Sequence, residues 1–501
     1  MKKKQKIILA LGVFLLAIIM YWNWLAGHYA TDTYNIINIG YEKYATGQSL
    51  KDGRLLNYIL TMLAGFLNLP IQAYVLITLL IALLISSASV IKLKNILLEG
   101  EDVSFQKELL LTFVSFFVIF NFIYIELMYF IESLVMALSI FLMICASDYI
   151  VNKRGKQNKF SNFTKILILS ILSVFSYQGT IGFLILITFV LSLVKHRKLL
   201  ENRKVKKYLL NVFIDSLLAI LATIIALIIN LLIVKIICSI LKTEQNRIGK
   251  LADMLNNIKY IFKHSSTVLI EASGLFPKYL LCIFTIILII IALIYDVKTK
   301  FKRLLTLKTM AIMTVCYVGT FLVSINTLTS FFTGRLRFCL GTLIGLILIL
   351  WLKENEQNNI FTKIIIAIAI IYGVINIINC LYITSLHKQV NTYEKNEIRI
   401  LNNYINKYEN QTNIKVTKIA IDTVKFQTDK AYFNSIDIKA VPTYNALRCN
   451  WAAGGVINFY TNRELKDTAL TQELLNKYKI QKNNNGYGIV NDTLIIECYM
   501  Y

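Results

Sequence analysis

Apolar segments long enough to cross a membrane recur along this chain, and short loops carrying lysine and arginine separate them. Over 501 residues the hydrophobic fraction is 56%, the mean hydropathy is +0.59 and there are only three prolines. A backbone inside lipid must satisfy its hydrogen bonds internally, and a helix does so within one segment. The pattern predicts an all-α polytopic membrane protein and excludes an ordinary soluble globule.

The first segment begins with MKKKQK and continues as IILALGVFLLAIIMYWNWLA. Its apolar run exceeds the roughly 7–15 residues of a signal-peptide core, and it ends in aromatic residues rather than at a small-residue cleavage site. We therefore expect a retained first span with its basic start in the cytoplasm. The net charge of +24 comes from similar clusters between apolar segments, so the membrane explains it and no nucleic-acid partner is expected.

Loops rich in lysine and arginine stay on the cytoplasmic side, and this rule sets the parity of the crossings. The segment 55–69 would be about 22 Å long as a helix, which is short for a bilayer core of about 30 Å. We expect it to be interfacial or re-entrant and to end at Pro70, with external segments at 26–70 and 236–278. Eleven crossings then give a cytoplasmic N-terminus and an external C-terminus. The expected spans are 7–25, 71–91, 109–124, 132–151, 164–177, 179–194, one starting near Tyr208, 279–296, 309–328, 337–352 and 363–384.

The composition changes after the membrane domain, which we place at residues 1–386. Residues 387–501 are rich in Asn, Lys, Tyr, Thr and Asp, and alternating runs such as IKVTKIAIDTV and YGIVNDTLIIECYMY predict strands. LTQELLNKYKI predicts a helix, so we expect a small extracytoplasmic α/β domain. It could cap the last spans or bind an acceptor. Cys449 and Cys498 could pair there if the region is outside the cell, whereas the other six cysteines lie in or beside apolar segments.

Acids and arginines gather on the expected outer side of the membrane. Charged side chains near spans are costly and tend to mark function. With one glutamine, these residues are Asp32, Asp52, Arg54, Glu126, Glu132, Gln178, Arg335 and Arg337.

Asp32 follows the first span, where a carboxylate could take a proton from an attacking hydroxyl. The alternative is structural, since Thr31 or Asp32 could simply cap a helix through TYNIINIGYEKY. Asp52 and Arg54, around Gly53, could likewise form only a turn followed by an arginine that snorkels to the interface.

Glu126 and Glu132 lie six residues apart, so they do not share one face of a continuous helix. The connection between two spans must bend to bring them together, and water-facing acids at the interface are the alternative. Tyr177 and Gln178 stand at a tight turn, where helix–helix hydrogen bonding is the plainer explanation.

Arg335 and Arg337 enter a span from its outer side, against the positive-inside tendency. A guanidinium binds phosphate oxygens in bidentate fashion, so a lipid-linked phosphate fits, with headgroup anchoring as the alternative. Asp215 and Lys235 are weaker candidates. The sequence contains no GxxxxGK[ST], no GxGxxG after a strand, and no Cys/His cluster typical of a structural metal site. A soluble nucleotide donor and ATP-driven transport are therefore disfavoured.

The stretch TDTYNIINIGYEKYATGQSLKDGRLLNYIL resembles the first external loop of the Gtr-type O-antigen glucosyltransferases, bacterial membrane enzymes of the GT-C fold class. ELMYFIESLVMALSIFL is similar to that family's two acids before SLxMALS, with Glu126 and Glu132 in those places. FSYQGTIGFL and GRLRFCLG are similar to its YQ segment and its late arginine. The glycine-tyrosine step and the GR-(P)-L motif of the first loop are matched by Gly40, Tyr41, Gly53, Arg54 and Leu55.

The resemblance covers roughly residues 10–350 and shows two departures. The family's acidic pair is reduced to Asp32, flanked by Thr31 and Thr33, and Leu56 stands where proline is usual.

The resemblance implies inverting transfer of a sugar, glucose in the family, from a polyprenyl-phosphate donor to a surface polysaccharide or wall polymer. The reaction would take place on the outer face of the bacterial cell membrane. No cofactor is assigned, although the chemistry leaves room for a divalent cation. Asp32 would be the general base, Arg54 with Arg335 or Arg337 would hold the phosphate, and the substrate-binding set would be completed by Asp52, Glu126, Glu132, Tyr177 and Gln178. The alternative is a transporter or flippase of lipid-linked saccharides, which should carry gating elements on both faces.

Overall fold

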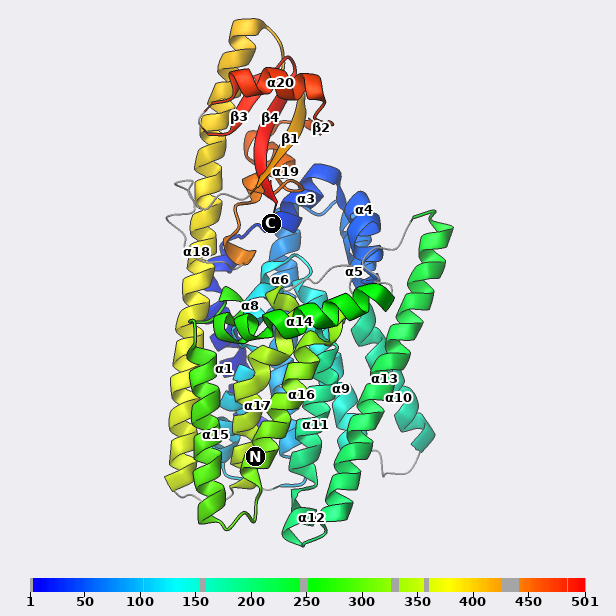
Figure 1. The fold of residues 1–501 in the computed structure, drawn as a ribbon, viewed down its shortest axis with the longest axis vertical. Helices are drawn as coiled ribbons and strands as arrows, with labels where there is room; N and C mark the ends of the chain where they lie inside the picture. The colour runs from blue at the N-terminus through cyan, green and yellow to red at the C-terminus, as the bar shows by residue number, and fades with distance from the viewer. Residues whose placement is uncertain are drawn as a thin grey trace.

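A computed structural model describes residues 3–101, 103–153, 159–243, 251–325, 333–355, 360–425, 441–483 and 485–500. The described chain is mostly helical, with a small sheet near its C-terminus. Most of the long helices run side by side as a bundle, whereas α14 lies across it (Figure 1).

The first half of the chain forms the bundle's N-terminal helices and the outer segment between α1 and α6. These elements are α1 (Lys3–Met20), α2 (Trp22–Leu25), α3 (Thr31–Ile39), α4 (Tyr41–Tyr44), a π-helical turn (Ala45–Leu50), α5 (Leu55–Phe66), α6 (Ile71–Leu97), α7 (Phe105–Ile119), α8 (Tyr124–Tyr129), α9 (Ser133–Asp148), a second π-helical turn (Tyr149–Lys153), α10 (Lys159–Ser176), a 3-10 turn (Gln178–Thr180) and α11 (Gly182–Lys195).

The second half completes the bundle. Its elements are α12 (Arg197–Glu201), α13 (Val205–Ile240), α14 (Leu251–Glu271), a 3-10 turn (Ala272–Gly274), α15 (Leu280–Lys298), α16 (Leu305–Ile325), a 3-10 turn (Gly334–Arg337), α17 (Phe338–Glu354) and α18 (Ile360–Thr412).

Eight helical segments of the described chain are long and apolar enough to cross a membrane, which supports a multi-pass membrane protein. Each of the eleven expected spans coincides with a helix, but α1, α7 and α10 fall outside those eight. The number of crossings and their direction therefore stay predictions. The segment 55–69 forms the short helix α5, which ends before Pro70 as expected. The expected external segment 236–278 begins later, since α13 continues to Ile240.

The helix α17 forms the centre of the bundle. Every residue from Phe338 to Glu354 is buried, whereas α15 exposes Ile283, Ile286 and Ile290 on one side. A helix that is apolar all round belongs inside a bundle, and exposed isoleucines on a spanning helix fit contact with lipid.

Helix α18 links the bundle to the C-terminal sheet. With 53 residues it is about 80 Å long, far more than a bilayer core of about 30 Å. It runs along one side of the molecule from the bundle to the sheet (Figure 1). The helix passes the expected boundary at residue 387 without a break.

The C-terminal region forms a four-stranded sheet of order β2-β1-β4-β3. β1 is parallel to both β2 and β4, and β3 and β4 form an antiparallel hairpin. The expected strands and helix are confirmed. The elements are β1 (Lys418–Lys425), 3-10 turns at Val441–Thr443 and Ala446–Arg448, α19 (Ala453–Thr461), β2 (Lys466–Asp467), α20 (Gln472–Gln481), β3 (Tyr487–Val490) and β4 (Thr493–Met500).

Alternate residues of the central strands face different helices. Ile419 and Leu494 pack with Ile398 and Leu401 of α18, while Ala420 and Ile495 pack with the α20 side of the sheet. This period of two is what a strand buried on both faces requires. The pairing of Cys449 with Cys498 is not seen, since both are buried free thiols.

Candidate functional site

Asp32 lies in the first turn of α3, the helix that follows the first span. The extended Ala30 holds the cap position, so the expectation that Thr31 or Asp32 caps this helix is wrong. A carboxylate in a first turn is favoured by the helix dipole. Asp32 is half-buried, and among the described residues it makes no hydrogen bond or ion pair. Its carboxylate is therefore available to a ligand.

The turn after the π-helical segment is fixed by two amides from distant helices. Gln178 Nε2 donates to the carbonyl of Gly53 at 2.7 Å, and Asn230 Nδ2 donates to the same oxygen at 3.0 Å. Gly53 has φ +78°, and a Cβ there would collide with the Gln178 side chain. Gln178 thus holds the Arg54 turn in place, and it also donates to Asn230 of α13 at 3.0 Å.

Arg54 is buried and forms an ion pair with Glu132, so the interpretation of Arg54 as a snorkelling residue is wrong. Asp52 lies 3.5 Å from the same guanidinium. Glu132 also accepts hydrogen bonds from Asn57 at 2.9 Å and Tyr44 at 3.4 Å. A buried charge held from several sides is rigid, which is what orienting a ligand requires.

Glu126 holds the turn that carries the two late arginines. The backbone N–H of Arg335 donates to Glu126 Oε2, and Gly334 leaves no room for a Cβ beside that carboxylate. A helix break at Phe130 separates Glu126 on α8 from Glu132 at the start of α9. The expected bend therefore exists, and each acid serves a different arginine.

The Arg335 guanidinium lies 4.0 Å from the centre of the Phe130 ring. Among the described residues its side chain makes no hydrogen bond or ion pair, and the residue is 9% exposed. Arg337 instead donates to Ser273 Oγ at 2.7 Å and is 5% exposed. Both arginines are too enclosed to be headgroup anchors only, and Arg335 keeps its donors free for a ligand.

These groups form one electrostatic cluster. Asp32 interacts with Arg335 and Glu132, and Arg335 also interacts with Glu126 and Tyr177. Arg54 lies 5.3 Å from the centre of the Tyr177 ring. Segments about 300 residues apart in sequence therefore converge at the end of the bundle that faces the C-terminal sheet (Figure 1).

Three members of this cluster were not anticipated from the sequence. Asn57 lies three residues after Arg54, a spacing that places both on one helix face. Asn230 is a polar residue inside the long apolar helix α13, which is a signal in itself. Tyr44 has no feature in the sequence that would have marked it as part of the site. The weaker candidate Asp215 accepts from Ser192 at 2.7 Å instead, away from this cluster.

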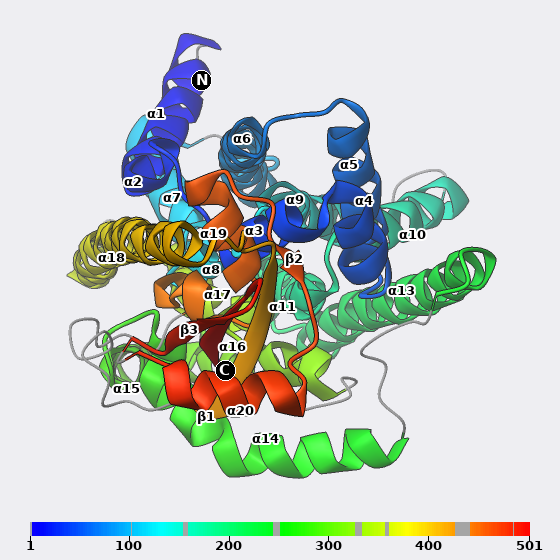
Figure 2. The same ribbon diagram turned by 90° about the horizontal axis from the view of Figure 1, so that it is seen from above.

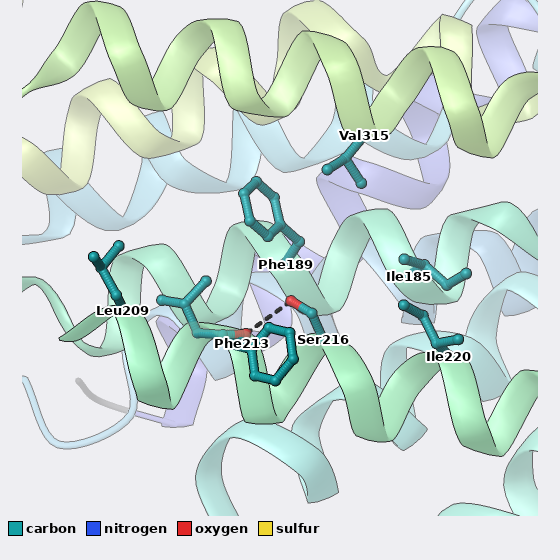
Figure 3. Close-up of a pocket in the computed structure, with 8 residues that line it drawn as sticks. Ile185, Phe189, Leu209, Phe213, Ser216, Ile220 and Val315 are labelled. Carbon is teal, nitrogen blue, oxygen red and sulfur yellow. Dashed lines mark hydrogen bonds between the residues drawn. The ribbon is translucent and has the colours of Figure 1, made fainter. Parts of the chain in front are cut away.

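An apolar pocket of about 320 Å³ lies between α11, α13 and α16 (Figure 3). Its one hydroxyl, Ser216, already donates to the carbonyl of Val212 at 2.8 Å. The pocket offers nothing to bind a sugar or a phosphate but fits a hydrocarbon chain. Its lining residues are Ile185, Phe189, Leu209, Val212, Phe213, Ser216, Ile220 and Val315.

The cluster can combine two kinds of chemistry. A carboxylate without a partner can accept a proton, and a guanidinium without a partner can stabilise negative charge on a nearby phosphate. Within the described residues there is no group of three or more His, Cys, Asp or Glu side chains placed to hold a metal ion.

Residues 21–350 match the family model described as Glucosyl transferase GtrII. This stretch holds every member of the cluster and ends before α18. No curated protein and no solved structure matches the chain.

Proposed function

The chain belongs to the GtrII glucosyl transferase family, and from this premise we propose that it transfers glucose from a polyprenyl-phosphate donor to a surface polysaccharide or wall polymer. The reaction takes place at the end of the bundle nearest the C-terminal sheet, on the outer face of a bacterial cell membrane. The observation that carries the proposal is the pairing of Asp32 with Arg335. These opposite charges interact, yet neither side chain makes a hydrogen bond or ion pair with another described residue.

Asp32 is the general base of the proposed reaction. An acceptor hydroxyl oxygen attacks the anomeric carbon of the donor sugar, and its proton passes to the Asp32 carboxylate. The bond between the anomeric carbon and the phosphate oxygen breaks in the same displacement, so the configuration inverts. Polyprenyl phosphate leaves with the bonding electrons. Because phosphate is a good leaving group, no general acid is needed there.

Arg335 stabilises the charge that grows on the departing phosphate. Its backbone is fixed by Glu126, and its guanidinium is supported by the Phe130 ring. Arg54, near the Tyr177 ring, adds positive charge, although Glu132 and Asp52 partly offset it. Arg335 is therefore the principal phosphate ligand in this proposal, with Arg54 and Arg337 as secondary ones.

The remaining acids and amides keep the site in shape. We assign Glu126 and Glu132 to the positioning of the arginines as well as to sugar hydroxyls, and Gln178 to the Arg54 turn. The prenyl chain lies along the apolar helices, for which the pocket beside α13 is suited. A divalent cation, if one takes part, would find carboxylates at Asp32 and Asp52.

The decisive experiment supplies polyprenyl-phosphate glucose to membranes that contain the protein and follows the anomeric configuration of the product by NMR. Transfer with inversion is the expected result. Transfer from a nucleotide-linked sugar alone would contradict the proposal. So would movement of the intact lipid-linked sugar across the bilayer with no glycosidic bond formed, since that is the activity of a flippase.

A further inference from the structure

The C-terminal domain, expected from residue 387 onward, packs on the helix that carries Asp32. Helix α19 contacts α3 directly, and the two lie side by side in the view from above (Figure 2). The family match ends at residue 350, so this contact joins a matched segment to an unmatched one. What the C-terminal domain does to α3 is thus a separate question from the family's chemistry.

The contact requires a glycine near the start of α19, at position 455. A Cβ on Gly455 would collide with the backbone carbonyl of Tyr34, which belongs to α3. A Cβ on Gly454 would meet only side-chain ends, those of Asn38 at 2.7 Å and Asp467 at 3.2 Å, which can rotate away. The backbones of α19 and α3 therefore approach closely at Gly455.

Hydrogen bonds fasten the same part of α3 to the domain. The Tyr34 hydroxyl donates to Glu394 Oε2 at 3.4 Å and lies 3.1 Å from the Tyr460 hydroxyl of α19. Glu394, fully buried on α18, also accepts from the backbone N–H of Ala446 at 2.6 Å. At the far end of α3, Asn38 Nδ2 donates to Asp467 Oδ2 at 2.7 Å.

A second part of the domain reaches the arginine side of the site. Tyr444 follows the Val441–Thr443 turn and lies close enough to Glu126 for the two to interact electrostatically. Glu126 is the acid that holds the Arg335 backbone. The domain thus touches both the Asp32 helix and the support of Arg335.

We propose that the C-terminal domain positions the general base, with Gly455, Tyr34 and Glu394 as positioning residues that set the placement of α3 relative to Arg335. This inference rests on the proposed function. A cap that only shields the last spans would need no close backbone contact at α3. An error of about 1 Å in a reacting group can lower turnover by up to about a hundred-fold.

The test compares Gly455→Ala with the matched control Gly454→Ala, using polyprenyl-phosphate glucose as donor in membranes that contain the acceptor. In Gly455→Ala we expect kcat to fall about ten- to a hundred-fold, with KM for the donor within about two-fold of wild type. Hydrogen exchange in α3 should accelerate. Gly454→Ala, which disturbs only the exposed contact between Asn38 and Asp467, should keep kcat and donor KM close to wild type. Equal kcat in the two variants, or a loss confined to donor KM, would overturn the inference.

If Gly455→Ala does not fold, Tyr34→Phe tests the inference instead. This variant keeps the ring and removes only the hydroxyl contacts to Glu394 and Tyr460. A few-fold fall in kcat at unchanged donor KM supports the inference, and wild-type kcat overturns it. Asp32→Asn is measured in parallel. Its inactivity beside unchanged positioning variants would reject the inference alone, whereas full activity of Asp32→Asn would reject the proposed function.

Discussion

The two ends of the helix bundle differ in how completely their buried charges are paired. At the end away from the C-terminal sheet, cations are matched with acids, as in Lys94 with Glu108 and Lys308 with Glu354, both at 2.5 Å. At the end near the sheet, Arg54 is paired with Glu132, but Asp32 and Arg335 interact without forming an ion pair. Paired charges hold helices together, whereas charges kept apart by the surrounding structure remain available to a ligand. The contrast assigns stability to one end and chemistry to the other.

The largest effect is expected from Asp32→Asn. The amide keeps the size of the carboxylate but cannot accept the acceptor's proton, so turnover should fall by about 10²–10⁴-fold. The melting temperature should be unchanged, because Asp32 has no described hydrogen-bond or ion-pair partner to lose. Glu42→Gln, an exposed acid on the neighbouring helix α4, is the control and should retain activity. Wild-type turnover in Asp32→Asn would remove the mechanism.

Arg335→Gln should have the second largest effect. The loss of the phosphate ligand should lower kcat/KM by about 10²–10³-fold. Arg335→Lys should recover part of that loss, since a lysine keeps the charge but not the bidentate geometry. Steady-state kinetics with polyprenyl-phosphate glucose make the measurement. If the lysine and glutamine variants were equally and only mildly impaired, charge at Arg335 would not matter to the reaction.

At the opposite end, Glu354→Ala should lower stability rather than chemistry. It leaves the Lys308 ammonium buried without its partner, at a cost of about 3–5 kcal/mol in the free energy of unfolding. The folded fraction should keep its kcat. The double variant Lys308→Met/Glu354→Leu should recover much of the stability, as followed by thermal unfolding. A fall in kcat in the stable double variant would contradict the assignment of stability to one end and chemistry to the other.

The smallest effect concerns pH and Glu394. This residue lies 34 positions into α18, about 51 Å from its start, and therefore beyond a bilayer core of about 30 Å. Burial raises the pKa of its carboxyl from an ordinary 4.5 to about 8, although hydrogen bonds from Asn391 and the Ala446 N–H oppose the rise. Because the folded pKa is the higher one, stability from Glu394 is complete below pH 4.5 and is lost as the pH rises through 8.

The melting temperature of the wild type should therefore fall between about pH 5 and 9 more steeply than that of Glu394→Gln, which cannot ionise. The groups facing Glu394 are Tyr34, Tyr129, Tyr460 and Glu397, and none of the tyrosines ionises in this range because their ordinary pKa is about 10. If the melting temperatures of the two proteins changed equally with pH, Glu394 would not titrate as described.

Sequence reasoning found the helices because hydrophobic length depends only on local residues. The structure has a helix at every expected span, and alternation predicted β1, β3 and β4 of the C-terminal sheet but not the two-residue strand β2. Sequence reasoning also selected the charged residues of the cluster, since acids and arginines beside spans are costly wherever they lie. The partners could not be predicted. Nothing in the spacing of Arg54 indicates that Glu132 neutralises it while Arg335 stays free.

The continuation of α18 past residue 387 was also missed, for a different reason. The change to polar composition looked like the end of a helix, although Ile398, Leu401 and Ile405 keep a helical spacing. This apolar stripe could have been recognised from the sequence. The contact of Gly455 with Tyr34 could not have been predicted, because it depends on how two distant helices meet.

The most direct test of the account is a structure of the protein with polyprenyl phosphate bound. We predict that the phosphate lies within about 3 Å of the Arg335 guanidinium, with the Asp32 carboxylate facing the same space and the prenyl chain along the apolar helices. A phosphate bound at the opposite end of the bundle, among the paired lysines, would contradict it.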